Sequence, residues 1–170
     1  YARAQSKLAE LILDGTIKPL KGDKTGRLVR EAALQGDMIA ETIVALEIIY
    51  SDGANDRDMT VAISKIRALA SQGKPRAQFI LSALIDEGRA NVLQGQSSID
   101  LLRASASSGF LKSMKVLGLR LLKEAGSDQE ISEEGFRWLR KSADAGDRES
   151  QLYLAMLCID QSNISKLCKK

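Results

Sequence analysis

The sequence of 170 residues contains no histidine, and this absence excludes several kinds of catalytic and metal site at once. Ser-His and Cys-His nucleophiles need an imidazole base, and imidazole is a common zinc ligand. The acidic segment 52–58 (DGANDRD) lacks the residue order and the closing glutamate of a calcium loop. We therefore expect a protein without catalytic residues, bound metal or cofactor, and not an enzyme.

Cysteine is also scarce, because the chain has only Cys158 and Cys168. A disulfide between them would attach the tail to the last helix and would indicate an oxidising compartment. Alternatively, Cys158 is a buried thiol and Cys168 is an unrelated tail thiol. Both interpretations remain open, and the lack of further thiols favours a periplasmic or secreted protein slightly over a cytoplasmic one.

Long apolar runs and strong charge are missing as well. No run approaches the roughly 18 apolar residues of a membrane span, so we expect no direct membrane insertion. The net charge is +3, and the basic residues of segment 18–30 are diluted by acidic neighbours. Nucleic-acid binders carry a more concentrated basic surface, so we expect no nucleic-acid partner.

What the sequence does contain is a phrase that recurs every 36 or 37 residues and ends in glycine at each copy. A fixed period of this length is typical of a helical hairpin that is stacked several times. Each glycine fits the left-handed cap of a helix, and the arginine that opens each phrase is interpreted as a solvated side chain. The phrases are Arg30–Gly36, Arg67–Gly73, Arg103–Gly109 and Arg140–Gly146.

A second apolar segment begins with a small residue four positions after each of these glycines. Within it, apolar residues recur at offsets 0, +4, +5 and +8, which lie on one helical face. The residue at +5 is always small, which allows a neighbouring helix to approach closely. Five such segments start at Ala4, Ala40, Ala77, Ser113 and Ser150, the last four of them after the four glycines, and the small residues at +5 are Ala9, Ala45, Ser82, Gly118 and Ala155.

These patterns predict a single all-α domain over residues 1–170. We expect a right-handed α-solenoid of about four antiparallel helix pairs plus an unpaired terminal helix. The predicted repeats are approximately 4–36, 37–73, 74–109 and 110–146, with a partial repeat over 147–170.

The phrases resemble the Sel-one-like repeat, a relative of the tetratricopeptide repeat, over nearly the whole chain. The best matches are Ala77-x-Phe-x-Leu-Ser-x-x-Ile-x-x-Gly88 and Trp138-Leu-Arg-Lys-Ser-Ala-x-x-Gly146. The tyrosine that the family carries near the end of its first helix is Ile or Leu here. The resemblance implies a bacterial scaffold or adaptor that binds another protein. Some members look like immunity proteins that neutralise a toxic effector enzyme, and this is the alternative function.

A partner would dock on the first helices of the repeats, which line the concave face of such solenoids. We expect contacts from the +1 and +10 columns and from two tyrosines, whose packing between repeats is an equal alternative. The apolar face of the unpaired last helix also predicts self-association. The candidate protein-binding residues are Gln5, Glu41, Gln78, Met114, Gln151, Tyr50, Glu87, Lys123 and Tyr153.

Overall fold

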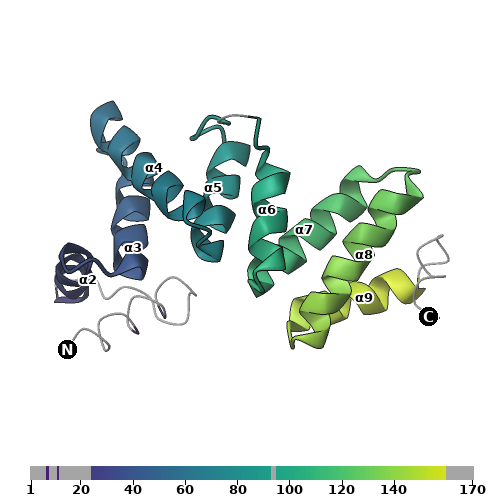
Figure 1. The fold of residues 1–170 in the computed structure, drawn as a ribbon. Coiled ribbons are helices and arrows are strands. Elements are labelled where there is room, and N and C mark those ends of the chain that lie inside the picture. Colours follow the sequence, from purple (N-terminus) through teal and green to yellow (C-terminus); the bar gives the residue numbers. More distant parts are fainter. Residues whose placement is uncertain (1–6, 8–10, 12–23, 93–94, 160–170) are drawn as a thin grey trace. The chain divides into compact units, whose positions relative to one another are not determined.

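The computed structural model describes residues 7, 11, 24–92 and 95–159, and every regular element within these ranges is an α-helix (Figure 1). The predicted all-α helical-repeat fold is confirmed. The chain divides into two compact units, residues 1–72 and 73–170, within one residue of a predicted repeat boundary. The helices are α2 (Lys24–Leu34), α3 (Met38–Ile49) and α4 (Asp56–Ser71) in the first unit, and α5 (Pro75–Asp86), α6 (Ser98–Ser107), α7 (Leu111–Glu124), α8 (Gln129–Asp144) and α9 (Arg148–Ile159) in the second.

In the first unit, α3 packs against both α2 and α4. One core cluster joins Val29 and Ala32 of α2 to Ala40 and Ile43 of α3. Ala40 is the small residue predicted to begin the apolar face of a first helix, and it lies in this cluster. The sequence pattern therefore places Ala40 correctly in the core.

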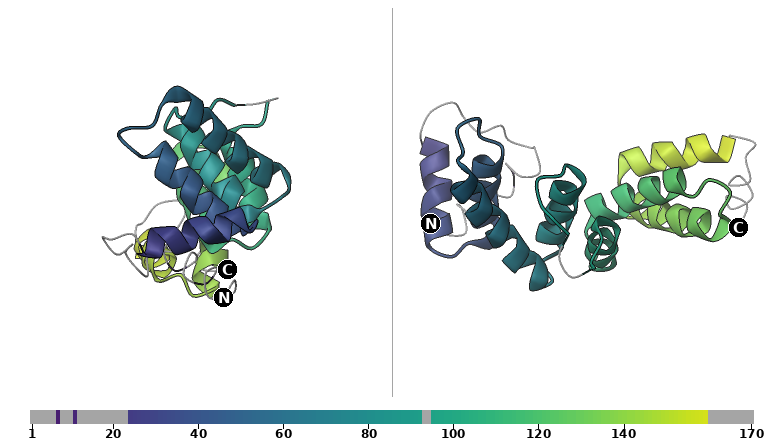
Figure 2. Two further views of the ribbon diagram at one scale, coloured as in Figure 1. Left: turned by 90° about the vertical axis from the view of Figure 1, so that its left-hand side faces the viewer. Right: turned by 90° about the horizontal axis from the view of Figure 1, so that it is seen from above.

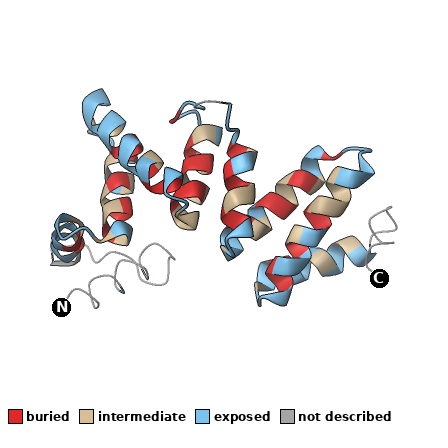
Figure 3. Cartoon of the chain, in the orientation of Figure 1, coloured by how far each residue is buried: buried red, intermediate tan, exposed pale blue. Residues whose placement is uncertain are grey.

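In the second unit, each helix packs against the next one along the chain, from α5 to α9. Its core cluster joins Leu102 and Ala106 of α6 to Leu117 and Leu121 of α7, and Trp138 packs against it while half-buried. Figure 3 shows the buried residues along the sides on which these helices face one another. Burial of such aliphatic faces is the main term that stabilises a stacked helical hairpin.

The four predicted capping glycines occupy equivalent places in the structure. Their φ angles are +82°, +75°, +88° and +95° at Gly36, Gly73, Gly109 and Gly146, a region that residues with a side chain rarely adopt. After the last of them, the amide of Asp147 donates to the carbonyl of Ser142, as in a Schellman cap. Each glycine therefore ends one helix and turns the chain into the next repeat.

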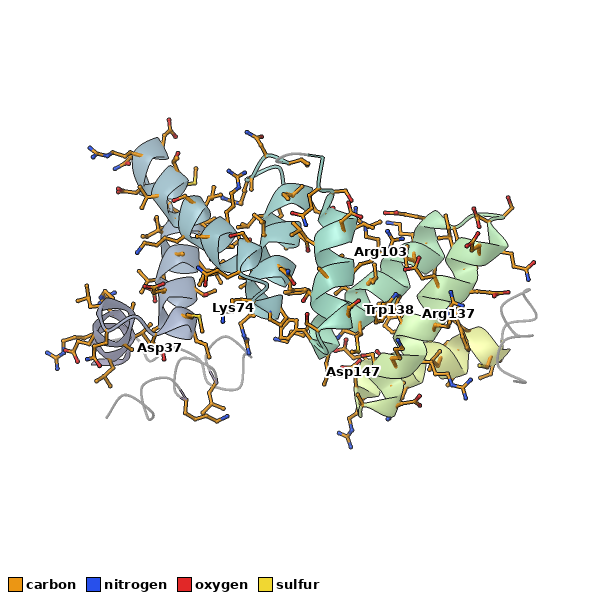
Figure 4. All side chains as sticks on the ribbon, in the orientation of Figure 1. Asp37, Lys74, Arg103, Arg137, Trp138 and Asp147 are labelled. Atoms are coloured by element: carbon orange, nitrogen blue, oxygen red, sulfur yellow. The ribbon has the colours of Figure 1, made fainter. Side chains whose placement is uncertain are left out.

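The residue that follows each glycine starts the next helix, and three of these residues are labelled in Figure 4. Asp37 accepts hydrogen bonds from the amides of Ile39 and Ala40, at 3.0 and 2.9 Å. Lys74 occupies the same position before α5 but makes no such side-chain bond. The first helical residue there is Pro75, and because proline has no amide hydrogen it leaves no unpaired donor at the start of the helix.

Helices α7 and α8 form an antiparallel hairpin whose backbones touch (Figures 1 and 2). A Cβ atom added to Gly118 would lie 2.8 Å from the amide nitrogen of Leu139 and 2.9 Å from the carbonyl oxygen of Gly135. This confirms the predicted role of the small +5 column. The matching small residue on α8, Gly135, was not predicted, although Ala62 and Ser98 occupy the equivalent positions of α4 and α6.

Candidate protein-interaction surface

The +10 column lies at the surface in every described repeat that contains it. Tyr50 caps the end of α3 and is 50% exposed, and Glu87 and Lys123 are exposed near the ends of α5 and α7. Glu87 forms an ion pair with Arg89 at 3.3 Å. These residues are therefore positioned to contact another molecule, and their role in binding stays a prediction.

The +1 column does not form an open surface. Gln78 is only 9% exposed, and half-buried Met114 packs against the core cluster of the second unit. Glu41 is half-buried, while exposed Gln151 donates its Nε2 to the carbonyl of Ala143 at 3.1 Å. The reason is helical geometry, because +1, +5 and +8 follow an i, i+4, i+7 stripe that faces the core. Gln5 lies outside the described residues.

Helix α9 carries the largest exposed apolar side chains of the second unit. Leu152, Met156 and Ile159 are 62%, 59% and 80% exposed, and their spacing places them on one helical face. Tyr153 is 42% exposed beside them. Leu154 and Leu157 of the same helix are half-buried. An apolar stripe this exposed is a recognised feature of interaction sites.

One lysine of α7 reaches the start of α9. Lys115 occupies the repeat position equivalent to Leu152. Its Nζ lies 2.6 Å from a carboxylate oxygen of Glu149 and 4.0 Å from one of Asp147, so this ion pair links α7 to the first turn of α9. We call this surface the α7–α9 face and define it by Lys115, Arg148, Leu152, Met156 and Ile159.

The two helices of this face are rich in positive charge. Together α7 and α9 hold five basic and two acidic residues, so their net charge of +3 equals that of the whole chain. Arg120, on α7, is neutralised by Asp86 at 2.6 Å and Glu124 at 2.9 Å. By contrast, α3 holds two acidic residues and no basic one.

Buried hydroxyl groups fix the start of α9 against α8. The Ser150 hydroxyl donates to a carboxylate oxygen of Asp147 at 2.6 Å and lies within hydrogen-bond distance, 3.0 Å, of the Ser142 hydroxyl. Burial opposes ionisation of Asp147, but the bonds from the hydroxyl and amide of Ser150 outweigh it and lower the pKa of this carboxyl. Asp147 therefore stays ionised at neutral pH, where it both anchors α9 and attracts Lys115.

A second polar network joins α6 to α8. Arg103 donates to both carboxylate oxygens of Glu134, each at 3.0 Å, and the indole of Trp138 donates to the same carboxylate at 3.2 Å. The bond from Arg103 lowers the pKa of Glu134 most strongly. Lys141 lies 4.4 Å from the centre of the Trp138 ring. Arg103 thus serves contacts within its own unit, in line with the interpretation of the arginine column as non-binding.

Neither a metal site nor a membrane span is found among the described residues. In residues 24–92 and 95–159, together with 7 and 11, no three His, Cys, Asp or Glu side chains gather as metal ligands would. None of the described helices combines the length and the apolar character of a bilayer-spanning segment. Cys158 is disulfide-bonded and exposed on α9, so it is not the buried thiol of the alternative interpretation. Cys168 lies outside the described residues.

Comparison with known proteins identifies the class of fold. Neither a protein-family model nor a curated protein matches the sequence significantly. A structure similar over 96% of this chain is that of c5321, a protective antigen of uropathogenic Escherichia coli that displays an SLR fold, at 22% identity and a TM-score of 0.64. A Sel1 repeat protein from Oxalobacter formigenes matches 84% of the chain, at 24% identity and a TM-score of 0.61.

These likenesses confirm the Sel-one-like repeat fold that the sequence resemblance predicted. The chain spans 35% of the length of the first protein and 56% of the second. The class of the chain is therefore that of a helical-repeat protein with the Sel1 fold.

Proposed function

We propose that this chain is a non-catalytic scaffold or adaptor that binds a partner polypeptide on the first helices of its repeats. The proposal rests on the α7–α9 face, where Leu152, Met156 and Ile159 are exposed on one side of α9, and Lys115 of the neighbouring repeat contacts the start of that helix. Stacked helical hairpins present such faces as extended binding surfaces. Large apolar side chains with a polar rim are the usual anatomy of a protein interface.

Site-specific photo-crosslinking in the native cell tests this proposal. A photoreactive amino acid would replace Tyr153 on α9, and the matched control would carry it at Arg140, an exposed position of α8. We expect a protein cross-link at position 153 that is weak or absent at position 140. Equal cross-linking at both positions, or none at position 153, would contradict the proposal.

The alternative function is that of an immunity protein that neutralises a toxic effector enzyme. Identification of the cross-linked product by mass spectrometry separates the two functions. A scaffold yields several partners, whereas an immunity protein yields one enzyme whose activity falls when the purified chain is added. The periplasmic or secreted localisation that the cysteines favour can be checked by fractionating the same cells.

A further inference from the structure

We propose that two ion pairs set the spacing of the first helices in the second unit, and that ionic strength therefore alters the width of the surface that these helices form. The ion pairs join Asp86 to Arg120 and Lys115 to Glu149, and each connects first helices of two successive repeats. We call these two ion pairs the first-helix bridges. This inference goes beyond the proposed function, because it concerns the free chain and does not depend on a partner.

The close packing of the second unit connects consecutive helices. Each of α5 to α8 packs against the helix that follows it, so one first helix is joined to the next through the second helix between them. The small rotation between successive repeats determines the curvature of such an array. A contact that skips a helix acts directly on this rotation, because it holds two helices of the same layer at a fixed distance.

The first of these bridges joins the end of α5 to α7. Nη1 of Arg120 lies 2.6 Å from one carboxylate oxygen of Asp86, and the hydroxyl of buried Ser98 donates to the other at 2.6 Å. Nε of Arg120 donates to Glu124 of its own helix at 2.9 Å, which orients the guanidinium group. The Arg120 side chain is 27% exposed, so solvent screens this contact less than it screens a pair at the open surface.

The second of these bridges joins α7 to the start of α9. Nζ of Lys115 lies 2.6 Å from a carboxylate oxygen of Glu149 and 4.0 Å from one of Asp147, and the lysine side chain is 19% exposed. The hydroxyl and amide of Ser150 hold Asp147 at the first turn of α9. Helix α7 therefore reaches the first helices of both the preceding and the following repeat.

An ion pair in the other layer provides the opposite case. Arg103 of α6 donates to both carboxylate oxygens of Glu134 of α8, so it joins two second helices in the same way. Loss of this contact should let the second helices separate and bring the first helices closer together. Loss of the first-helix bridges should do the reverse. A general loss of stability would not give opposite changes in the two layers.

Double electron–electron resonance on the full chain measures the spacing. Nitroxide labels on ketone-bearing amino acids at positions 87 and 153, both exposed, would report the distance from the end of α5 to α9 without altering the cysteines. The variant Lys115→Met/Arg120→Met removes both cations and keeps apolar stems in their place. We expect the mean distance between the labels to lengthen by about 2 Å, the size of an ordinary helix shift.

Further variants separate the first-helix bridges from other effects. Asp86→Asn/Glu149→Gln should lengthen the distance equally, because it removes the same bridges from their acidic ends. Arg103→Met should leave the distance unchanged or shorten it. The matched control Lys123→Met/Arg140→Met removes exposed cations of α7 and α8 that belong to neither bridge, and it should change nothing. Circular dichroism would verify that every variant folds.

Salt provides a second measurement on the same proteins. In 1 M NaCl the Debye length is about 3 Å, so the bridges of the unmodified chain weaken and its distance should approach that of the bridge variants. The inference is overturned if both bridge variants keep the original distance, if Arg103→Met or the matched control lengthens it equally, or if the difference persists undiminished in 1 M NaCl. Because no partner is present, none of these results decides the cross-linking test of the scaffold function.

Discussion

The two units share one backbone pattern but differ in the residues that form their helix contacts and ion pairs. Where the second helix of one repeat meets the first helix of the next, the first unit places Ala32 beside Ala40, and the second unit places Ser105 beside Ser113 at 2.6 Å. The ion pairs differ too. In the first unit Arg27 and Glu31 are 3.9 Å apart and Arg30 and Glu47 3.8 Å apart, and all four side chains are exposed, whereas Arg103 and Glu134 form a two-bond contact.

At these two junctions the contact residues are alike in size and differ in polarity. Both alanine and serine are small enough to let consecutive helices approach, so either residue satisfies the geometry. A buried hydroxyl, however, must have a hydrogen-bond partner, so serine makes the contact directional and its loss more costly. The second unit should therefore respond more strongly to substitution and to pH than the first.

The largest effect is expected where the second unit packs most closely. Gly118→Ala should destabilise the protein by about 3 kcal/mol, because the new methyl group would overlap the backbone of α8. This loss should exceed the gain of about 1 kcal/mol that alanine brings to a helix interior. The free energy of unfolding in urea, followed by circular dichroism, measures the change.

Ala155→Leu is the matched control, because Ala155 occupies the same repeat position on α9 and is exposed there. We expect it to change the free energy of unfolding by less than about 0.5 kcal/mol. A Gly118→Ala protein as stable as the unmodified chain would show that α7 and α8 do not touch through their backbones.

A smaller effect is expected at the buried serine pair. The Ser105 hydroxyl contacts both the Ser113 hydroxyl and the carbonyl of Pro75, each at 2.6 Å, so removing it breaks two contacts, whereas removing the Ser113 hydroxyl breaks the contact with Ser105. Ser105→Ala should therefore cost about 2 kcal/mol and Ser113→Ala about 1 kcal/mol. Urea unfolding of both variants gives the difference.

Ser71→Ala serves as the control for the serine pair, since the exposed hydroxyl of Ser71 donates to the carbonyl of Ala68 in its own helix. It should leave stability unchanged. If Ser105→Ala were as harmless as Ser71→Ala, the contrast between hydroxyl and alanine contacts in the two units would have no energetic basis.

The smallest effect is expected for the loss of folding stability at low pH. The hydrogen bond from Arg103 lowers the pKa of Glu134 in the folded protein. Such a group stabilises the fold above its unfolded pKa of about 4.3, and this contribution disappears as the pH falls through the lower folded value. Because the pair is partly exposed, we expect less than about 1 kcal/mol.

Urea unfolding of the unmodified chain and of Glu134→Gln, from pH 7 down to about pH 3, measures this contribution. The unmodified chain should be the more stable of the two at pH 7, and the difference should shrink with acidification. The control Glu47→Gln, in the long ion pair of the first unit, should show no such difference. A gap between the two chains that stayed constant or widened toward low pH would contradict the assignment.

The helical pairs, their capping glycines and the close +5 column could all be predicted from the sequence. These features depend on backbone geometry, which requires particular residue sizes at particular spacings. Gln78 was predicted to lie on a binding surface because glutamine is polar, but it is buried. Its position on the i, i+4, i+7 stripe of the helix would have predicted this burial. The contact of Lys115 with Glu149 could not be predicted, since it depends on the distance between successive first helices and on side-chain conformation.

Hydrogen–deuterium exchange on the full chain, with and without a partner captured at position 153, tests most directly whether the first helices of the second unit receive the partner. Binding should slow exchange in α7 and α9, residues 111–124 and 148–159, and leave α4 and α6 unchanged. Protection confined to α4 or α6, with α7 and α9 exchanging as in the free chain, would contradict the account.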